Sequence, residues 1–375
     1  MGEGDGTSTG IVFLSGGSAL QSLARFLAAR GHEASHVISV FDTGGSAGRL
    51  RDVCTGIAIG DIRKRLTAIG DHEAPTSRPL VDLFASRLPS DEPVHSVRRR
   101  VEEAAQGEGE LLDGLYNGSS HEIAEAFARV LAAVPDSFDW CDGSIGNLIL
   151  SGRYLHEGGW AAALRWAHHR LAACGTVFPV STSGADLGAR LANGRRVVGQ
   201  AAITSQSQPI EAPIEEIFLQ KTDEEGETVC VDPHPAVLDE LRAARAVVYS
   251  WGSFYTSVLP SLLVEDVGET IRDCDVPKVL LLNPVRDSET QGKKPADLVR
   301  EIKRYAGAAN GNGHARAPIT HTVALRLPNG ESFYRASDRA EIEAQGVEVI
   351  EVDSPGLPGE AELHRVAGEL LALAG

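Results

Sequence analysis

Apolar runs of strand length alternate along the chain with stretches that carry leucine and phenylalanine at helical spacing. Residues 10–17 (GIVFLSGG) predict a buried strand that ends in a glycine turn, and residues 18–31 (SALQSLARFLAARG) predict a helix after it. Residues 36–42 (HVISVFD), 244–253 (ARAVVYSWGS) and 276–285 (VPKVLLLNPV) predict further strands. Because strands that are apolar on both faces belong in a parallel sheet covered by helices, we predict an α/β protein with an open, doubly wound, mostly parallel sheet. Ligands of such sheets bind outside the carboxyl ends of the strands.

A block of helices interrupts this alternation. Between about residues 75 and 140 the strand pattern fades, and four stretches there have the spacing of helices: residues 80–88, 94–106, 109–118 and 121–134. Two more helices are expected over residues 144–175, with Ser144 as the N-cap of the first and a Gly158-Gly159 pair between them. We therefore place a helical insertion in the core at residues 75–140.

The remaining segments define the domain organisation. From residue 176 to 220 the pattern predicts short strands in a more irregular, glycine-rich segment. Residues 306–318 (AGAANGNGHARAP) are the best linker candidate because they carry few bulky apolar side chains. We therefore predict one core over residues 10–310 and a C-terminal α/β extension over residues 315–375 that packs on the core.

Composition and charge exclude several classes of protein. The 52 acidic and 35 basic residues give a formal net charge of −17, which repels the polyanionic backbone of nucleic acids. No apolar run approaches the roughly 20 residues that a membrane-spanning helix needs, and the acidic N-terminus is unlike a signal peptide. The five scattered cysteines show no metal-ligand spacing. We therefore expect a cytoplasmic protein whose partners are neither nucleic acid nor membrane.

The segment SGGSAL (residues 15–20) joins the first predicted strand to the first helix. Its backbone amides should point at whatever lies at the N-terminus of that helix, which favours an anion. Gly16, Gly17 and Ser18 are therefore candidate phosphate ligands. The spacing fits neither the G-x-G-x-x-G fingerprint nor a P-loop, and the alternative is that the glycine pair makes a tight turn for packing.

The segment after the second predicted strand adds another such element. Asp42 ends that strand, open glycine-rich backbone follows, and Arg49 and Arg51 are placed to bind phosphate oxygens. Asp61 begins the next helix, with Arg63 two residues on. Two aspartates beside arginines and glycines suit a divalent metal that bridges carboxylate and diphosphate. The alternatives are a turn in which Asp42 bonds its own backbone and a helix cap at Asp61.

Six segments, in order along the chain, resemble the successive motifs of the 2-phospho-L-lactate transferase (CofD-like) family, and especially its bacterial YvcK-like branch. The segments are residues 10–20 (GIVFLSGGSAL), 40–51 (VFDTGGSAGRLR), 60–66 (GDIRKRL), 146–150 (GNLIL), 251–264 (WGSFYTSVLPSLLV) and 278–284 (KVLLLNP). The resemblance implies a Rossmann-like, three-layer α/β/α core with a helical insertion. It also implies a pocket for a nucleotide diphosphate conjugate, and it is compatible with a homodimer.

The resemblance assigns roles to residues that match the motifs. Asp42 and Asp61 fall on the acidic positions of the family, which in the transferases lie near the metal and the acceptor. The positions that fall on its glycine loops are Gly16, Gly17, Gly44, Gly45 and Ser46. The positions that fall on later motifs lining the same pocket are Asn147, Ser253, Tyr255 and Thr256.

Two functions follow from the resemblance. In the first, which the shared chemistry narrowly favours, the protein is a Mg²⁺-dependent transferase. It passes a phospholactyl-type group from a GDP-linked conjugate to the hydroxyl of a deazaflavin and releases GMP, with Asp42 and Asp61 as catalytic residues and metal ligands. In the second, the protein is a non-catalytic regulator of the YvcK type that binds a UDP-sugar in the same pocket.

The sequence departs from the family pattern beside these residues. The family usually has a second acid after Asp42, where this chain has Thr43, a predicted ligand-binding residue. The lost carboxylate weakens a Mg²⁺ site. Ile59 stands where the YvcK-like branch has proline, and Lys64 stands where it has asparagine. These departures indicate a divergent member of the family.

Overall fold

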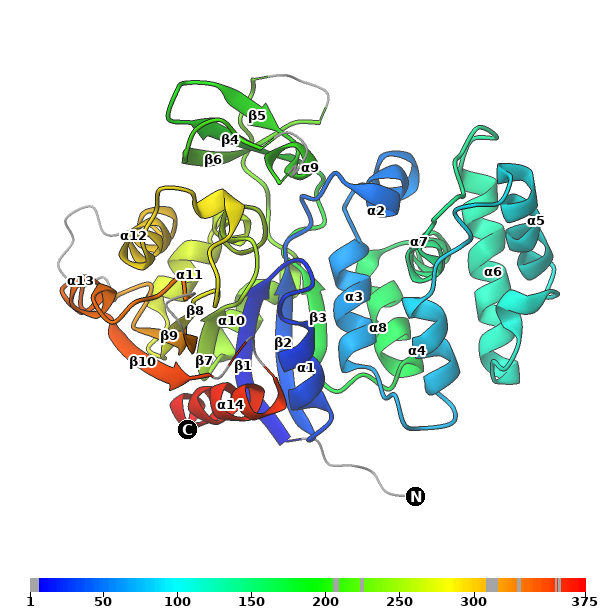
Figure 1. The fold of residues 1–375 in the computed structure, drawn as a ribbon. Coiled ribbons are helices and arrows are strands. Elements are labelled where there is room, and N and C mark those ends of the chain that lie inside the picture. The colour runs from blue at the N-terminus through cyan, green and yellow to red at the C-terminus, as the bar shows by residue number, and fades with distance from the viewer. Residues whose placement is uncertain are drawn as a thin grey trace.

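A seven-stranded parallel sheet forms the centre of the computed structural model, which describes residues 7–204, 209–222, 226–307, 316–328, 332–354, 356 and 359–375. Its strands are, in chain order, β1 (Thr7–Ser15), β2 (His32–Ile38), β3 (Thr176–Pro179), β7 (Ala246–Tyr249), β8 (Lys278–Leu281), β9 (His321–Arg326) and β10 (Glu348–Asp353). They lie in the order β10-β9-β8-β7-β1-β2-β3, and every described pair is parallel (Figure 1). The predicted doubly wound α/β fold is confirmed.

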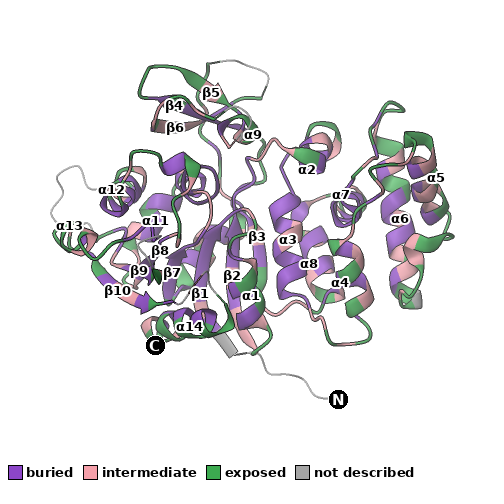
Figure 2. Ribbon diagram, viewed as in Figure 1, coloured by how far each residue is buried: buried purple, intermediate pink, exposed green. Residues whose placement is uncertain are grey.

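Helices cover both faces of the sheet because its strands carry apolar side chains on both. In β1, Ile11 and Phe13 pack on the side of α1 (Gln21–Ala28) and α14 (Glu360–Ala374), whereas Leu14 packs on the other side. The helices of that other side are α3 (Gly60–Ile69), α10 (Pro235–Ala243), α11 (Val267–Asp273), α12 (Pro295–Tyr305) and α13 (Asp338–Glu343). Figure 2 shows the buried residues concentrated in the strands and in the inner surfaces of these helices.

The helices of the insertion lie between β2 and β3 in the chain and beside the sheet in space (Figure 1). They are α4 (Arg78–Ala85), α5 (Val94–Ala105) and α6 (Asn117–Ala133), followed by α7 (Ile145–Glu157) and α8 (Trp160–Arg170). Ser144 caps α7 as predicted, because its hydroxyl accepts a hydrogen bond from the Asn147 amide at 3.4 Å. The separate helix predicted over residues 109–118 is wrong: a 3-10 turn forms at Glu110–Leu112, Gly114 has a positive φ, and the next helix, α6, begins at Asn117.

A second, antiparallel sheet lies beyond the carboxyl ends of the first (Figure 1). It consists of β4 (Asp186–Leu191), β5 (Arg196–Val198) and β6 (Ile214–Gln220) in the order β5-β4-β6. The short helix α9 (Gln200–Ile203) follows β5 and brings the Ala201 amide to 3.5 Å from the Thr43 hydroxyl. The small sheet therefore covers the loop that follows β2.

The C-terminal residues complete the main sheet. β9 pairs with β8, β10 pairs with β9, and α14 packs against α1 and β1. The boundary predicted at residues 310–315 lies outside the described residues. Across the described ranges, no helix is long and apolar enough to cross a membrane.

The second strand ends earlier than its apolar pattern predicts. β2 stops at Ile38, although the residues up to 41 are also buried. The reason is that its neighbour β1 ends at Ser15 and turns away, so that the Ser39 amide, 2.9 Å from the Ser15 carbonyl oxygen, makes the last contact between them. Asp42 thus lies in the loop between β2 and α2 (Gly45–Leu50), not at the end of a strand.

Gly152 sets the distance between α6, the last helix of the insertion, and α7, which follows it. A Cβ at position 152 in α7 would lie 2.0 Å from the Ala126 carbonyl oxygen of α6, a backbone atom that cannot move aside alone. We predict that Gly152→Ala lowers the free energy of unfolding by about 2–3 kcal/mol, measured by urea denaturation. Gly368→Ala in α14 is the control, because nothing lies within 4 Å of its Cβ. It should raise the same free energy by about 0.5–1 kcal/mol, and equal effects of the two changes would contradict the packing.

Candidate functional site

The candidate site lies where the winding of the sheet changes direction. β1 is followed by α1 and then by β2 on one side, whereas β7 lies on its other side. The loops after β1 and β7 therefore diverge at the carboxyl edge, which is the place where open α/β sheets bind ligands. The loop after β2 and the first turn of α3 lie at the same edge.

The loops after β1 and β7 are in close contact at Gly16. A Cβ at position 16 would lie 3.0 Å from the Cβ of Ser257, so a larger residue would push the two loops apart. Gly17 has a φ of +64°, a left-handed conformation that favours glycine. The turn itself needs both glycines, in agreement with the packing alternative, and their role in binding phosphate stays a prediction.

The Asp61 carboxylate links α3 to this turn. Its Oδ2 accepts a hydrogen bond from the Gly17 amide, and its Oδ1 lies 2.8 Å from the Lys64 ammonium. The N-cap of α3 is Ile59, so the interpretation of Asp61 as a helix cap is wrong. The Asp61 carboxylate instead accepts the hydrogen bond of the Gly17 amide, which the sequence predicted to bind a phosphate.

Asp42 shapes its own turn. Its Oδ1 accepts a hydrogen bond from the Gly44 amide at 2.8 Å, which confirms the turn interpretation. Burial raises the pKa of the Asp42 carboxyl and the charge of Asp61 raises it further, while the Gly44 hydrogen bond and the charge of Lys64 lower it. The two predicted aspartates therefore lie near enough to interact.

The groups around the two aspartates fit Mg²⁺ poorly. Mg²⁺ requires a near-octahedral set of oxygen ligands, but each carboxylate already accepts a backbone hydrogen bond, and Asp61 also pairs with Lys64. The Thr43 hydroxyl lies 3.5 Å from the Ala201 amide. Within the described ranges, no three His, Cys, Asp or Glu side chains are grouped to hold a metal. Lys64 thus places a positive charge directly beside the Asp61 carboxylate.

Two arginines predicted to bind phosphate are paired with groups of distant segments. Arg49 donates hydrogen bonds to the Asp139 carboxylate and, at 3.0 Å, to the Cys141 carbonyl oxygen. Arg51 is buried, and its Nη2 lies 2.8 Å from Asp186 Oδ1 at the start of β4. These pairs fasten the α2 region to the insertion and to the small sheet. A phosphate role for either arginine stays a prediction.

Two further arginines of α3 lie close to Asp61. Burial lowers the pKa of Arg63 to about 10, and its Nη1 donates to the Phe84 carbonyl oxygen at 3.4 Å. Arg65, which no motif singled out, is buried with its pKa lowered to about 10 by that burial, and its Nη2 donates to Ser15 Oγ at 3.3 Å. Among the described residues, Nε and Nη1 of Arg65 have no hydrogen-bond partner. Its i, i+4 spacing from Asp61 is the signal that could have identified it.

The structure brings Ser46 and Asn147 together. Ser46 Oγ accepts hydrogen bonds from Asn147 Nδ2 at 3.3 Å and from the Ser144 amide at 3.4 Å, and all three residues are buried. This contact joins α2 to the start of α7. In the part of the chain that is described, Asn147 Oδ1 is buried without a hydrogen-bond partner.

The π-helical turn η3 (Phe254–Val258), which follows β7, holds the remaining predicted residues. Glu289 Oε2 accepts hydrogen bonds from the Tyr255 and Thr256 amides, each at 3.0 Å, and Oε1 accepts one from the Thr256 hydroxyl at 2.5 Å. Tyr255 and Thr256 are buried, and Ser253 precedes the turn. Glu289, which lies in the 3-10 turn η5 (Ser288–Thr290), was missed by the motifs although it fixes the orientation of η3.

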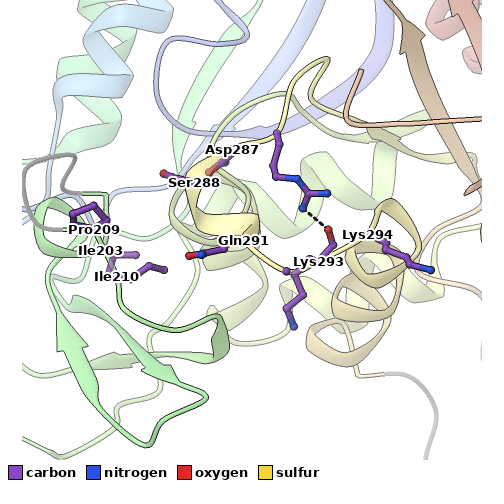
Figure 3. A pocket seen from close by; sticks show the side chains of 10 residues that line it. Ile203, Pro209, Ile210, Asp287, Ser288, Gln291, Lys293 and Lys294 are labelled. Atoms are coloured by element: carbon purple, nitrogen blue, oxygen red, sulfur yellow. Dashed lines mark hydrogen bonds between the residues drawn. The ribbon is translucent and has the colours of Figure 1, made fainter. Parts of the chain in front are cut away.

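A cavity of about 670 Å³ lies beside this turn (Figure 3). Ile203 and Ile210, from α9 and the segment that follows it, line one side, and Ser288 and Gln291 from the loop between β8 and α12 line the other. Asp287, also in the lining, joins the cavity to η3 because its Oδ2 accepts a hydrogen bond from the Phe254 amide at 3.2 Å. None of the predicted site residues is among those that line the cavity.

The sheet, its change of winding and the glycine turn define a doubly wound α/β protein with a candidate ligand site at the carboxyl edge between β1 and β7. Residues 11–355 match the family described as 2-phospho-L-lactate transferase CofD. The chain belongs to this CofD family, and the predicted family is confirmed.

Several bacterial relatives carry the description gluconeogenesis factor. The chain is 29% identical over 299 residues to the gluconeogenesis factor of Bacillus subtilis, covering 79% of this chain and 75% of the relative. It is 27% identical over 344 residues to a putative gluconeogenesis factor of Thermotoga maritima, covering 90% and 87%. For a putative gluconeogenesis factor of Deinococcus radiodurans the match is 27% over 298 residues, 79% of this chain but 51% of the relative. The chain thus spans about half the length of that relative.

A solved structure has the same fold. It is a crystal structure of a Bacillus halodurans protein described as a member of the UPF0052 family, with a TM-score of 0.68 and 22% sequence identity. The match covers 96% of this chain and 99% of that chain. At this identity, the likeness supports the fold alone.

Glu289 makes the stability of the protein depend on pH. Burial and, secondarily, the charge of Asp287 raise the pKa of the Glu289 carboxyl to about 7, although its hydrogen bonds oppose the rise. A carboxyl group with a higher pKa in the folded than in the unfolded protein destabilises the fold as the pH rises from the unfolded value of about 4.3. Between pH 5 and pH 8, the wild type should lose about 2–3 kcal/mol of unfolding free energy relative to Glu289→Gln. Urea denaturation at both pH values measures this, and a difference that does not change with pH would contradict the raised pKa.

Proposed function

We propose that this chain binds a nucleotide diphosphate conjugate such as a UDP-sugar and acts as a regulator, without Mg²⁺-dependent turnover. The observation that carries the proposal is the Asp61–Lys64 ion pair beside the Gly17 amide. The Lys64 ammonium supplies positive charge for a diphosphate without a metal. The description of the relatives as gluconeogenesis factors agrees with a regulatory role. The motif chemistry alone narrowly favours the transferase, but Thr43 stands where the family usually has a second acid, and the lost carboxylate weakens a Mg²⁺ site.

The charges near the glycine turn support the binding of an anion. Three consecutive basic residues, 63–65, lie on α3, and two carboxylates, those of Asp42 and Asp61, offset only part of their charge. The 670 Å³ cavity beside η3 has an apolar side and a polar side and is large enough for a sugar or a base. We assign the diphosphate to the turn and the remainder of the conjugate to this cavity.

A transferase is the second candidate because of Asp42. Burial raises the pKa of its carboxyl, and a carboxylate with a raised pKa is a stronger base towards an acceptor hydroxyl, for example that of a deazaflavin. The acceptor oxygen would form a bond to the phosphorus of the phospholactyl group, the bond from that phosphorus to the GMP oxygen would break, and Asp42 would take the hydroxyl proton. The family description agrees with this chemistry.

Thermal denaturation with UDP-sugars, UDP and GDP, each with Mg²⁺ and with EDTA, tests the proposed binding. We expect a UDP-sugar to raise the melting temperature in both conditions, because Lys64 balances the charge of the diphosphate. Lys64→Met should weaken the affinity about tenfold and make the remaining binding depend on Mg²⁺. Lys303→Met in α12 controls for the general loss of a positive charge. A protein that none of these nucleotides stabilises would rule out the proposed binding.

Prolonged incubation separates the regulator from the transferase. The protein is mixed with Mg²⁺, a deazaflavin acceptor and either a UDP-sugar or a GDP-linked phospholactyl donor, and nucleoside monophosphates are measured by chromatography. We expect none above the rate without protein. Release of GMP that is lost in Asp42→Asn would instead favour the transferase and contradict a purely regulatory role.

A further inference from the structure

The Asp61 carboxylate has the surroundings of a bound anion. Its Oδ2 accepts a hydrogen bond from the Gly17 amide in the turn between β1 and α1. Its other oxygen lies 2.8 Å from the Lys64 ammonium, and its side chain is only 9% exposed. A backbone amide of a glycine turn together with a cation is the combination that holds a phosphate oxygen in other proteins. An intramolecular anion therefore fills the position that an anionic ligand needs.

The buried guanidinium of Arg65 lies behind the same turn, and two of its nitrogens have no hydrogen-bond partner among the described residues. Arg65 is 1% exposed, and its Nη2 donates to Ser15 Oγ at 3.3 Å, directly before Gly16. Its Nε and Nη1 have no hydrogen-bond partner among the described residues. Buried charged donors without a partner are costly, so a carboxylate that reached them would stabilise the site. Asp61 lies one helical turn before Arg65 and already attracts it electrostatically.

We propose that Asp61 is a displaceable internal anion: the diphosphate of the ligand replaces it on the Gly17 amide, and the freed carboxylate turns to Arg65. This inference rests on the proposed nucleotide site and adds an autoinhibitory contact to it. Weak anions bind poorly because they must compete with a group that is already in place. Lys64 stays beside the turn in both states and exchanges the carboxylate for a phosphate oxygen.

Titration calorimetry with inorganic pyrophosphate in EDTA tests the exchange. Asp61→Asn removes the charge that competes for Gly17, so we expect the affinity for pyrophosphate to rise by about tenfold or more. If Asp61 were instead a metal ligand, its loss would not strengthen binding in EDTA. Asp42→Asn is the matched control, because it removes an equal charge nearby while its hydrogen bond goes to Gly44. Unchanged or weaker binding by Asp61→Asn, or equal gains in both variants, would overturn the proposal.

Two further measurements sharpen the test, and the second stays decisive if Asp61→Asn folds poorly because it needs no variant. Arg65→Met should weaken pyrophosphate binding in the wild-type background but have little effect in the Asp61→Asn background, and additive effects would contradict the exchange. In the wild-type protein, saturating pyrophosphate should shift the amide resonance of Gly17, and an unshifted resonance would also overturn it.

The outcomes distinguish this inference from the proposed function. If pyrophosphate shows the expected changes but no nucleotide conjugate binds, the exchange stands and the proposed function fails. If conjugates bind the wild type and Asp61→Asn with equal affinity, the proposed function stands and the exchange fails.

Discussion

The hydrogen bond from the Gly17 amide to Asp61 holds together the parts of the molecule from which the site is built. It ties the turn after β1 to the first turn of α3. The neighbouring Gly16 packs against Ser257 in the loop after β7, and Glu289 binds that loop to the one after β8. Because each of these contacts joins a different pair of segments at the carboxyl edge of one sheet, the position of the glycine turn determines the geometry of the whole edge.

Most charged side chains of the site are paired with other groups of the protein. Lys64 pairs with Asp61, Arg51 pairs with Asp186, and Asp42 bonds its own turn, so that most of the charges expected to meet a ligand are already satisfied by protein groups. Arg65 is the largest departure among these arginines, because two of its buried nitrogens have no described hydrogen-bond partner, whereas Arg51 and Arg63 each have one such nitrogen. In the exchange that we propose, these protein groups change partners when a ligand binds, and the binding free energy includes the cost of that exchange.

The sequence predicted the sheet because its strands are apolar on both faces, as Ile11 and Leu14 of β1 show by packing on opposite sides. It also placed Asp42 and Asp61 at the same edge. It did not predict what the Asp61 carboxylate binds, because Gly17 lies 44 residues from Asp61 in the chain and comes close only when β1 and α3 are in place. Glu289 was missed for the same reason: its contact with Thr256 depends on β7 and β8 being neighbours.

For Arg49 and Arg51, the sequence predicted ligand contacts, but the structure shows both paired with protein groups. Arg49 and Arg51 have the right spacing from a glycine loop to bind phosphate, but the helical insertion and the small sheet bring acids to both. Local spacing shows which groups a loop can offer, whereas distant segments determine which of them remain free.

The most direct test of this account is a crystal structure of the protein with bound UDP. The account predicts a phosphate oxygen on the Gly17 amide, Lys64 beside it and the Asp61 carboxylate turned to Arg65. A diphosphate bound away from the turn, or held by a metal between Asp42 and Asp61, would contradict it.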